Sequence, residues 1–406
     1  MSDQESFDMR EMRLFIEEVC FNLFRFEQVE EQDLPPQDVH IQQEIFLGVP
    51  GLHADMRISV PNRKPFFVEV KFGIPPGRLV SDLLRKFGQS LPQIDDADRL
   101  IVITDWKKAD QYKTVLEELR GGLAANLELE IWDRNELAKR VARHFDVEID
   151  FGCDDTLVLR EAMDDIKGRY AFGDDWRNDL LQSSLLWHYG YWLLKDLYER
   201  HDRDARKIFP PSLYPNVVAL LADLTSFSSY VRDTRDTRVL RQSLTSFYSK
   251  ARNEIINAGG MMYQFVGDEV VGLFGLPERS PEYIDKAFDT AHALIDIGNA
   301  VSWDWQRQID RIQKASGVHI GMAMGDMQFV SLRPFGAARL GAVSDSINMG
   351  ARMLGQASAD EVVVSNTFYQ NLEESRQQGF ECLEPVEAKN MGKIRAWKLS
   401  LAARSW

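Results

Sequence analysis

The feature that most constrains this chain is a pair of apolar segments that each carry one aspartate. The first segment, residues 217–222, reads Val-Val-Ala-Leu-Leu-Ala and is followed by Asp223. The second, residues 265–274, places Asp268 within a run of mainly apolar residues. A carboxylate in a β-like apolar segment is costly unless it is paired or bound to a cation. Two such aspartates, one per strand, therefore predict a site for hard divalent metal ions.

Length and charge set the broad class of the protein. The chain has 406 residues, which predicts two domains with a helical connector. Its net charge of −15 argues against broad binding to nucleic acid or anionic membranes, although a local basic pocket for a phosphorylated ligand is compatible with it. The acidic N-terminus does not resemble a signal peptide, and no apolar run approaches the roughly 18–20 residues that span a bilayer. We therefore expect a soluble, cytoplasmic protein.

Residues 1–150 alternate between helical and extended patterns. Residues 8–28 carry apolar side chains at helical spacing and predict an opening helix. Further helices are expected near residues 79–90, 110–119 and 135–144, and strands at 44–49, 54–60, 65–72, 99–104 and 127–132. Strands mixed with helices over this length predict a small α/β domain.

Three charged residues of this domain form a candidate site. Asp55 lies on one predicted strand, and Glu69 and Lys71 share one face of the next strand. Carboxylates beside a lysine can hold Mg²⁺ and activate water. The arrangement resembles the core motif of restriction-endonuclease-like folds, with Gln89 as a further match. The alternative is an ordinary salt-bridged strand pair in a sensor or scaffold, which the lack of an evident phosphate-tracking surface favours.

Residues 151–212 predict a helical connector. A helix over residues 178–198 carries a dense apolar and aromatic stripe, which is typical of a core or a helix–helix contact, and a dimer seam is an alternative. The proline-rich run at residues 209–215 cannot continue a helix. It therefore marks the start of a third segment, residues 213–402.

The third segment predicts another α/β domain, in which strands alternate with long helices. We expect helices at residues 227–258, 281–311 and 347–357 and a hairpin at 261–274. The sequence has no GxxxxGK[ST] loop, so a P-loop mechanism is excluded. Zinc chemistry has no support, because the histidines are not clustered and Cys20, Cys153 and Cys382 lie far apart as expected free thiols.

Four motifs of this domain identify a family resemblance. They are Leu-Ala-Asp-Leu-Thr-Ser-Phe at 221–227, Gly-Gly at 259–260 with Phe-Val-Gly-Asp at 265–268, His-Ile-Gly-Met-Ala-Met-Gly-Asp at 319–326, and Val-Ser-Asp-Ser-Ile-Asn-Met-Gly-Ala-Arg at 343–352. Over roughly residues 216–400 they resemble, in order and spacing, a class III nucleotidyl cyclase domain. The resemblance implies a ferredoxin-like βαββαβ core and cyclisation of a nucleoside triphosphate.

The resemblance also implies roles for individual residues. Asp223 and Asp268 match the carboxylates that hold two Mg²⁺ or Mn²⁺ ions, with the Leu224 carbonyl as an extra ligand. Asn348 and Arg352 match the pair that orients the ribose and stabilises charge on the transferred phosphate, and their spacing places them on one helix face. In the family these two sets meet across a dimer interface, so a two-fold homodimer with two equivalent sites is expected.

Two positions depart from the better-known cyclases. Gln264 replaces the lysine or glutamate that reads a purine, and Gly341 replaces its usual Asp, Thr or Cys partner. A neutral amide does not select a purine edge by charge. Tyr263 and Arg339 flank these positions and are candidates to contact a smaller base. Lys389 and Lys393 are candidates to bind the triphosphate.

These departures resemble the pyrimidine cyclases of the bacterial Pycsar anti-phage systems. The resemblance implies that UTP is converted into 3′,5′-cyclic UMP and pyrophosphate, and that a separate effector protein reads the product. A cytidylate or purine cyclase is the first alternative. A non-catalytic nucleotide-binding regulator is the second, and a nuclease in residues 1–150 controlled by the cyclase fold is the third.

Overall fold

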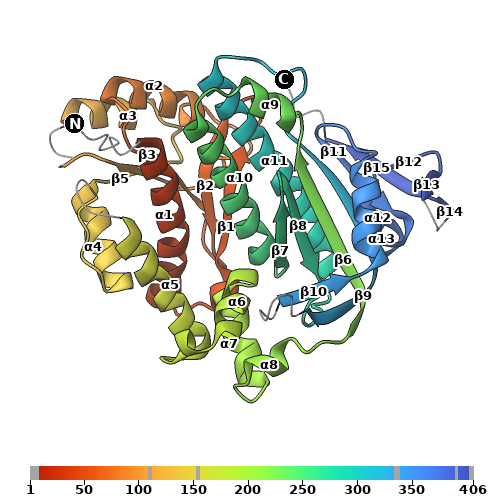
Figure 1. Cartoon of the computed structure of the whole chain (residues 1–406). Helices are drawn as coiled ribbons and strands as arrows, with labels where there is room; N and C mark the ends of the chain where they lie inside the picture. Colours follow the sequence, from red (N-terminus) through yellow and green to blue (C-terminus); the bar gives the residue numbers. More distant parts are fainter. Residues whose placement is uncertain (1–8, 108–111, 152–155, 333–338, 389–391, 402–406) are drawn as a thin grey trace. The chain divides into compact units, whose positions relative to one another are not determined.

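The computed structural model describes residues 9–107, 112–151, 156–332, 339–388 and 392–401 (Figure 1). The chain divides into two compact units, Met1–Lys167 and Gly168–Trp406. The boundary falls inside a helix, α5 (Thr156–Phe172). The division into residues 1–150, 151–212 and 213–402 stays a prediction, and Cys153 lies outside the described residues.

The N-terminal unit is built on a five-stranded sheet in the order β1-β2-β3-β4-β5. Strands β1 to β3 are antiparallel, and β3, β4 and β5 are parallel. The strands are β1 (His40–Phe46), β2 (His53–Ser59), β3 (Phe66–Lys71), β4 (Arg99–Thr104) and β5 (Glu128–Trp132), and the helices are α1 (Met9–Gln32), α2 (Pro76–Phe87), α3 (Lys113–Gly122), α4 (Arg134–Phe145) and the first part of α5. Every residue of β3 is buried, as expected for a strand covered on both faces. The predicted small α/β domain is confirmed.

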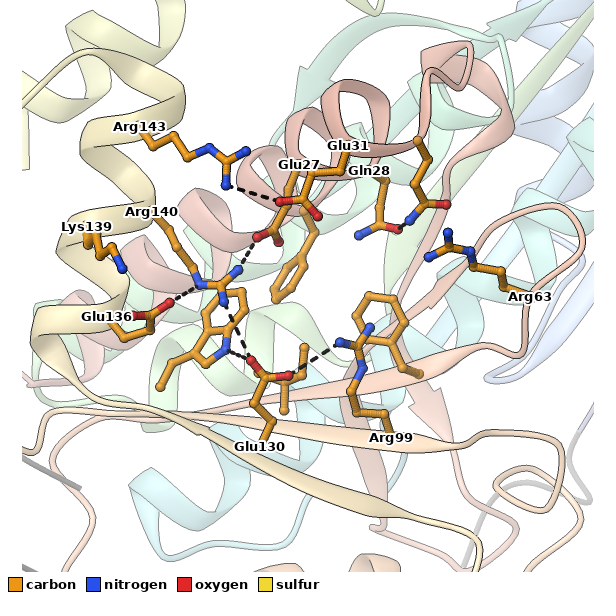
Figure 2. A pocket seen from close by; sticks show the side chains of 15 residues that line it. Glu27, Gln28, Glu31, Arg63, Arg99, Glu130, Glu136, Lys139, Arg140 and Arg143 are labelled. Carbon is orange, nitrogen blue, oxygen red and sulfur yellow. Dashed lines mark hydrogen bonds and ion pairs between the residues drawn. The ribbon is translucent and has the colours of Figure 1, made fainter. Parts of the chain in front are cut away.

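Ion pairs hold α1 to α4 around a cavity of about 350 Å³ (Figure 2). Arg140 of α4 lies over the Trp132 ring, 3.9 Å from its centroid, and also pairs with Glu27 of α1. One turn further along α4, Arg143 pairs with Glu31 at 3.3 Å. Ion pairs among the lining residues therefore offset much of the charge of this cavity.

The C-terminal unit is built on an eight-stranded sheet with the order β12-β15-β11-β9-β6-β8-β7, and β10 pairs with β9. Its strands are β6 (Leu213–Leu224), β7 (Met261–Val266), β8 (Glu269–Phe274), β9 (Val318–Leu332), β10 (Arg339–Val343), β11 (Glu361–Ser365), β12 (Glu381–Cys382) and β15 (Ala396–Ser400). A separate two-stranded sheet pairs β13 (Val386–Ala388) with β14 (Gly392–Ile394). The helices are the end of α5, α6 (Leu180–His188), α7 (Tyr191–Arg200), α8 (Ala205–Ile208), α9 (Phe227–Asp233), α10 (Thr237–Asn257), α11 (Tyr283–Ile309), α12 (Asp345–Leu354) and α13 (Asn366–Asn371).

The core of this unit has the predicted βαββαβ order. Strand β6 is followed by α9 and α10, the hairpin β7–β8, α11 and β9, and the four strands lie in the order β9-β6-β8-β7. Leu220 and Ala222 of β6 belong to one hydrophobic cluster with Phe247 of α10 and Leu294 of α11. Strand side chains alternate between faces, so these helices cover one face of β6. The ferredoxin-like expectation is confirmed.

Helix α12 packs on the opposite face of the same sheet. A Cβ at Gly350 would lie 2.5 Å from Leu221 Cδ1, and a Cβ at Gly321 of β9 would lie 2.2 Å from the backbone nitrogen of Leu354. Glycine at both positions therefore lets helix and sheet approach closely. Among the described residues, no helix has the length and apolar character needed to cross a membrane.

Two predicted helices are interrupted. The helix expected over residues 227–258 divides into α9 and α10, because Asp236 caps a new helix by accepting a hydrogen bond from the Arg238 N–H at 2.9 Å. The helix expected over residues 178–198 begins at Leu180 and divides into α6 and α7 at Tyr189 and Gly190. The prediction of one continuous helix was therefore wrong in both ranges.

Candidate active site

Strand β6 positions the first aspartate at the end of a buried segment. Residues 217–222 are fully buried, and Asp223 follows them beside His319 of β9 in the antiparallel register. Since Leu221 and Asp223 are two residues apart, they share the face of the strand on which α12 packs. The sequence thus places a carboxylate where the core meets solvent.

The second aspartate lies in the tight turn between β7 and β8. Gly267 and Asp268 form this turn, and Gly267 has a φ of +66°, which glycine adopts readily. The Tyr248 hydroxyl donates to the Gly267 carbonyl and holds the turn to α10. Strand β8 pairs with β6 so that Val270 lies opposite Ala222. This register brings Asp268 to Asp223.

The two carboxyl groups are close enough to share a hydrogen bond, and both resist ionisation. Burial raises the pKa of Asp223, and the nearby Glu269 raises it further. Burial, the hydrogen bond and the charge of Asp223 raise the pKa of Asp268 to about 7. Among the described residues, no lysine or arginine pairs with either aspartate.

This carboxylate pair fits a divalent cation. Oxygen donors are the ligands that Mg²⁺ and Mn²⁺ prefer, and a bound cation would offset the burial and the negative charge of neighbouring carboxylates, which raise both pKa values. No group of three or more His, Cys, Asp or Glu side chains in the described part of the chain has the arrangement of a metal site. The protein would therefore supply two carboxylates and leave other positions to backbone, water or substrate. Leu224 ends β6 with its side chain in the core, and the role of its carbonyl stays a prediction.

His319 is a neighbour that the residue-by-residue predictions omitted. Its Nε2 lies 3.6 Å from Asp223 Oδ2, and its Nδ1 lies 3.2 Å from the Thr225 hydroxyl. Burial lowers the pKa of this imidazole, so the neutral form is favoured near neutral pH. The signal was present in the sequence, because His319 opens the third of the four family motifs and lies on a predicted strand.

Asn348 and Arg352 lie one turn apart on α12. Ser344 caps this helix by accepting a hydrogen bond from the Ser346 N–H at 2.9 Å. Gly350 and Met353 are buried, whereas Asn348 is exposed and Arg352 is half-buried. The Asn348 amide donates to the Ser344 carbonyl at 3.4 Å. The pair thus occupies a less buried part of the helix than the residues packed on the sheet, and its catalytic role stays a prediction.

The residues predicted to contact the base come from β7 and β10. A β-bulge interrupts the β7–β8 register between Met262 and Gln264, at Tyr263. The Tyr263 hydroxyl accepts a hydrogen bond from the Ala342 N–H at 3.0 Å, which brings Tyr263 next to the buried Gly341. Gln264 is exposed. Bulges re-aim side chains, and here the bulged residue reaches β10.

The remaining predicted residues lie apart from this group. Arg339 begins β10 opposite Leu332 of β9, and its side chain is outside the described part of the structure. Lys393 is exposed in β14 opposite Glu387. Lys389 lies outside the described residues. Their contacts with a triphosphate stay predictions.

The N-terminal candidate residues also meet. Lys71 Nζ lies 3.0 Å from Asp55 Oδ2 and forms a further ion pair with Glu69. Lys86 of α2, which the sequence analysis did not single out, pairs with both carboxylates. Gln89 is exposed beyond the end of α2.

Comparisons with known proteins identify one family for the C-terminal part of the chain. Residues 209–400 match the family model described as the adenylate and guanylate cyclase catalytic domain. Solved structures that resemble the chain include the guanylate cyclase domain of RhGC from Catenaria anguillulae in complex with GTP, at 20% identity and a TM-score of 0.38 over 46% of this chain and 97% of that one. They also include the adenylyl cyclase CyaB from P. aeruginosa, at 15% identity and a TM-score of 0.40 over 45% and 93% of the two chains.

A bacterial light-regulated adenylyl cyclase is similar over a longer stretch, at 13% identity and a TM-score of 0.41 over 68% of this chain and 70% of that one. A comparison with curated proteins found no match. The family model, together with the β6 and β7–β8 aspartates and the βαββαβ core, leads to one assignment. Residues 209–400 form an adenylate and guanylate cyclase catalytic domain of class III.

Proposed function

We propose that this protein is a nucleotidyl cyclase that converts UTP into 3′,5′-cyclic UMP and pyrophosphate. The observation that carries the cyclase part is the contact between Asp223 and Asp268 within a cyclase catalytic domain, where burial and this contact raise the pKa of Asp268 to about 7. Two carboxylates held this close without a lysine or arginine partner among the described residues form a cation-binding arrangement.

The reaction needs a nucleophile, a leaving group and charge stabilisation. The ribose 3′-oxygen loses its proton to water and attacks the α-phosphorus in line. The bond from the α-phosphorus to the oxygen that bridges to the β-phosphate breaks, and pyrophosphate leaves. When bound, two Mg²⁺ or Mn²⁺ ions lower the pKa of the 3′-hydroxyl and neutralise the triphosphate. Asp223 and Asp268 hold these ions in the proposal, and the Leu224 carbonyl adds a ligand.

Asn348 and Arg352 act in the proposal from a second copy of the chain. The exposed Asn348 orients the ribose, and the Arg352 guanidinium stabilises charge on the transferred phosphate. Their one-turn spacing on α12 lets both face the same substrate. A two-fold homodimer would then hold two equivalent sites.

Three features support a pyrimidine as the base. Gln264 presents a neutral amide, and Gly341 presents no side chain. The Tyr263 hydroxyl accepts a hydrogen bond from the N–H of Ala342, the residue that follows Gly341. A purine reader built from buried charged groups is therefore missing at these two positions. The likeness to Pycsar cyclases further suggests a role in bacterial anti-phage defence through an effector that binds cyclic UMP.

A product assay separates the candidate substrates. Purified protein is incubated with UTP, CTP, ATP or GTP and Mn²⁺, and the cyclic nucleotide and pyrophosphate are quantified. We expect cyclic UMP as the main product. Cyclic CMP, AMP or GMP as the main product would overturn the choice of base and keep the cyclase. No product from any nucleotide would favour a non-catalytic nucleotide-binding regulator.

A further inference from the structure

A second pair of carboxylates lies in the N-terminal unit, on adjacent strands. The backbone N–H of Asp55 on β2 donates to Glu69 Oε1 at 3.1 Å, and the backbone N–H of Val70 on β3 donates to Asp55 Oδ2 at 2.8 Å. These bonds fix both carboxylates against the sheet. Lys71 completes the set that resembles a restriction-endonuclease-like site, for which a divalent metal is implied.

Lys86 brings a second ammonium group into this set from α2. Its Nζ lies 2.7 Å from Glu69 Oε2, 3.0 Å from Glu69 Oε1 and 3.4 Å from Asp55 Oδ1. Lys71 Nζ contacts Asp55 Oδ2 at 3.0 Å and also Glu69 Oε2. Each of the four carboxylate oxygens therefore accepts at least one bond from an ammonium or a backbone N–H. Lys86 sits where a cation bridging the two acids would sit.

The cluster is buried and its charges balance. The side chain of Glu69 is fully buried, and those of Lys71, Lys86 and Asp55 are 6%, 12% and 14% exposed. Burial acts to raise the pKa of Asp55, but Lys71, Lys86 and Arg13 together hold it below its usual range. The two carboxylates and two ammonium groups form a neutral set, and the nearby Arg13 is paired with Glu17 at 3.3 Å. A divalent cation added to it would leave an uncompensated buried charge, which is strongly unfavourable.

The residues present therefore do not fit the metal that the resemblance implies. We propose that Lys86 closes the Asp55–Glu69 pair to divalent cations, so that the N-terminal unit holds a structural ion cluster in place of a metal centre. This inference is independent of the proposed cyclase function. It also favours the sensor or scaffold interpretation of residues 1–150 over a metal-dependent nuclease.

The test uses the full chain with the C-terminal cation site disabled by Asp223→Asn and Asp268→Asn, titrated with MnCl₂ in a calorimeter. With Lys86 present we expect no Mn²⁺ uptake that depends on Asp55. Uptake that is lost when Asp55→Asn is added would overturn the proposal. This titration needs no change at Lys86, so it decides the question even if substitution of Lys86 prevents folding.

A second titration removes the closing group. In the same background, Lys86→Met leaves two carboxylates with only Lys71, and we expect the gain of about one Mn²⁺ per chain, lost again on adding Asp55→Asn. Lys64→Met removes a positive charge from an exposed position of the same unit and should gain nothing. A folded Lys86→Met chain, checked by circular dichroism, that takes up no Mn²⁺ would contradict the closing role of Lys86.

Discussion

The two units each hold a pair of acidic side chains, on neighbouring strands in the N-terminal unit and on a strand and a hairpin turn in the C-terminal unit, yet the pairs behave in opposite ways. Asp55 and Glu69 are surrounded by two lysines, and the pKa of Asp55 is lowered. Asp223 and Asp268 meet no lysine or arginine among the described residues, and both pKa values are raised. The comparison teaches that a carboxylate pair alone does not define a metal site. The cations already present around it decide whether another can enter.

We expect the largest effect from two variants that each lack a different half of the proposed C-terminal site. Asp223→Asn and Arg352→Ala should each reduce cyclisation by about 10³-fold, because each removes one half of every site. When the two variants are mixed and allowed to exchange subunits, half of the dimers carry one intact site. We therefore expect about a quarter of the unmodified activity to return. Failure of the mixture to gain activity, with subunit exchange demonstrated, would contradict a shared site.

The N-terminal pair should respond to loss of a lysine through stability. Lys71→Met leaves two buried carboxylates with only Lys86, and we expect the free energy of unfolding of this unit to fall by about 3–5 kcal/mol. Urea denaturation followed by hydrogen exchange in residues 1–167 measures this change. Lys64→Met, at an exposed position, should change it by less than about 0.5 kcal/mol. Equal losses of stability from Lys71→Met and Lys64→Met would contradict the claim that lysines compensate the buried Asp55–Glu69 pair.

Divalent cations should stabilise one unit and leave the other unchanged. Saturating Mn²⁺ should raise the unfolding midpoint of the C-terminal unit by about 5 °C, because it binds the folded carboxylate pair. Asp268→Asn should remove this shift, and Asp174→Asn, an exposed aspartate of the same unit, should keep it. A Mn²⁺ shift in residues 1–167 would show that the N-terminal pair is open as well.

The pH dependence of the N-terminal unit gives a smaller, graded effect. The pKa of Asp55 is lowered in the folded state, so its stabilisation is present above the unfolded value of about 3.9 and is lost as pH falls below it. The pKa of Lys71 is raised, because its attraction to Asp55 and Glu69 outweighs burial, so its stabilisation is present below about 10.4 and is lost at higher pH. Hydrogen exchange in residues 1–167 should show a plateau of stability between these limits. In Asp55→Asn, the loss of stability at acid pH should become smaller. An unchanged loss of stability at acid pH would argue against the ion cluster.

The sequence predicted the positions of the strands better than it predicted the contacts between elements that are far apart along the chain. The apolar run before Asp223 and the Gly-Asp turn at Asp268 are local signals, and both led to the observed strand ends. Lys86 could not be found in this way, because it reaches Asp55 across 31 residues from a helix. Nothing in its immediate sequence distinguishes it from an exposed helical lysine.

The base-contact region shows the same limit. The alternation of side chains along β7 does not predict that Tyr263 contacts β10. A β-bulge at Tyr263 changes the direction of its side chain, and bulges are not evident from the sequence pattern. The division of α9 from α10 did have a local signal in Asp236, a good helix cap, but the apolar spacing on either side suggested one continuous helix. Periodicity therefore located the elements, whereas bulges, caps and long side chains determined what they bring together.

The most direct test of the central claim compares the unmodified chain with Asp268→Asn for UTP turnover in Mn²⁺. The account predicts cyclic UMP and pyrophosphate in equal amounts from the unmodified chain, and a loss of about 10³-fold in Asp268→Asn with the fold intact by circular dichroism. Asp174→Asn should match the unmodified chain. Undiminished production of a cyclic nucleotide by Asp268→Asn would contradict the claim that the Asp223–Asp268 pair is the catalytic centre.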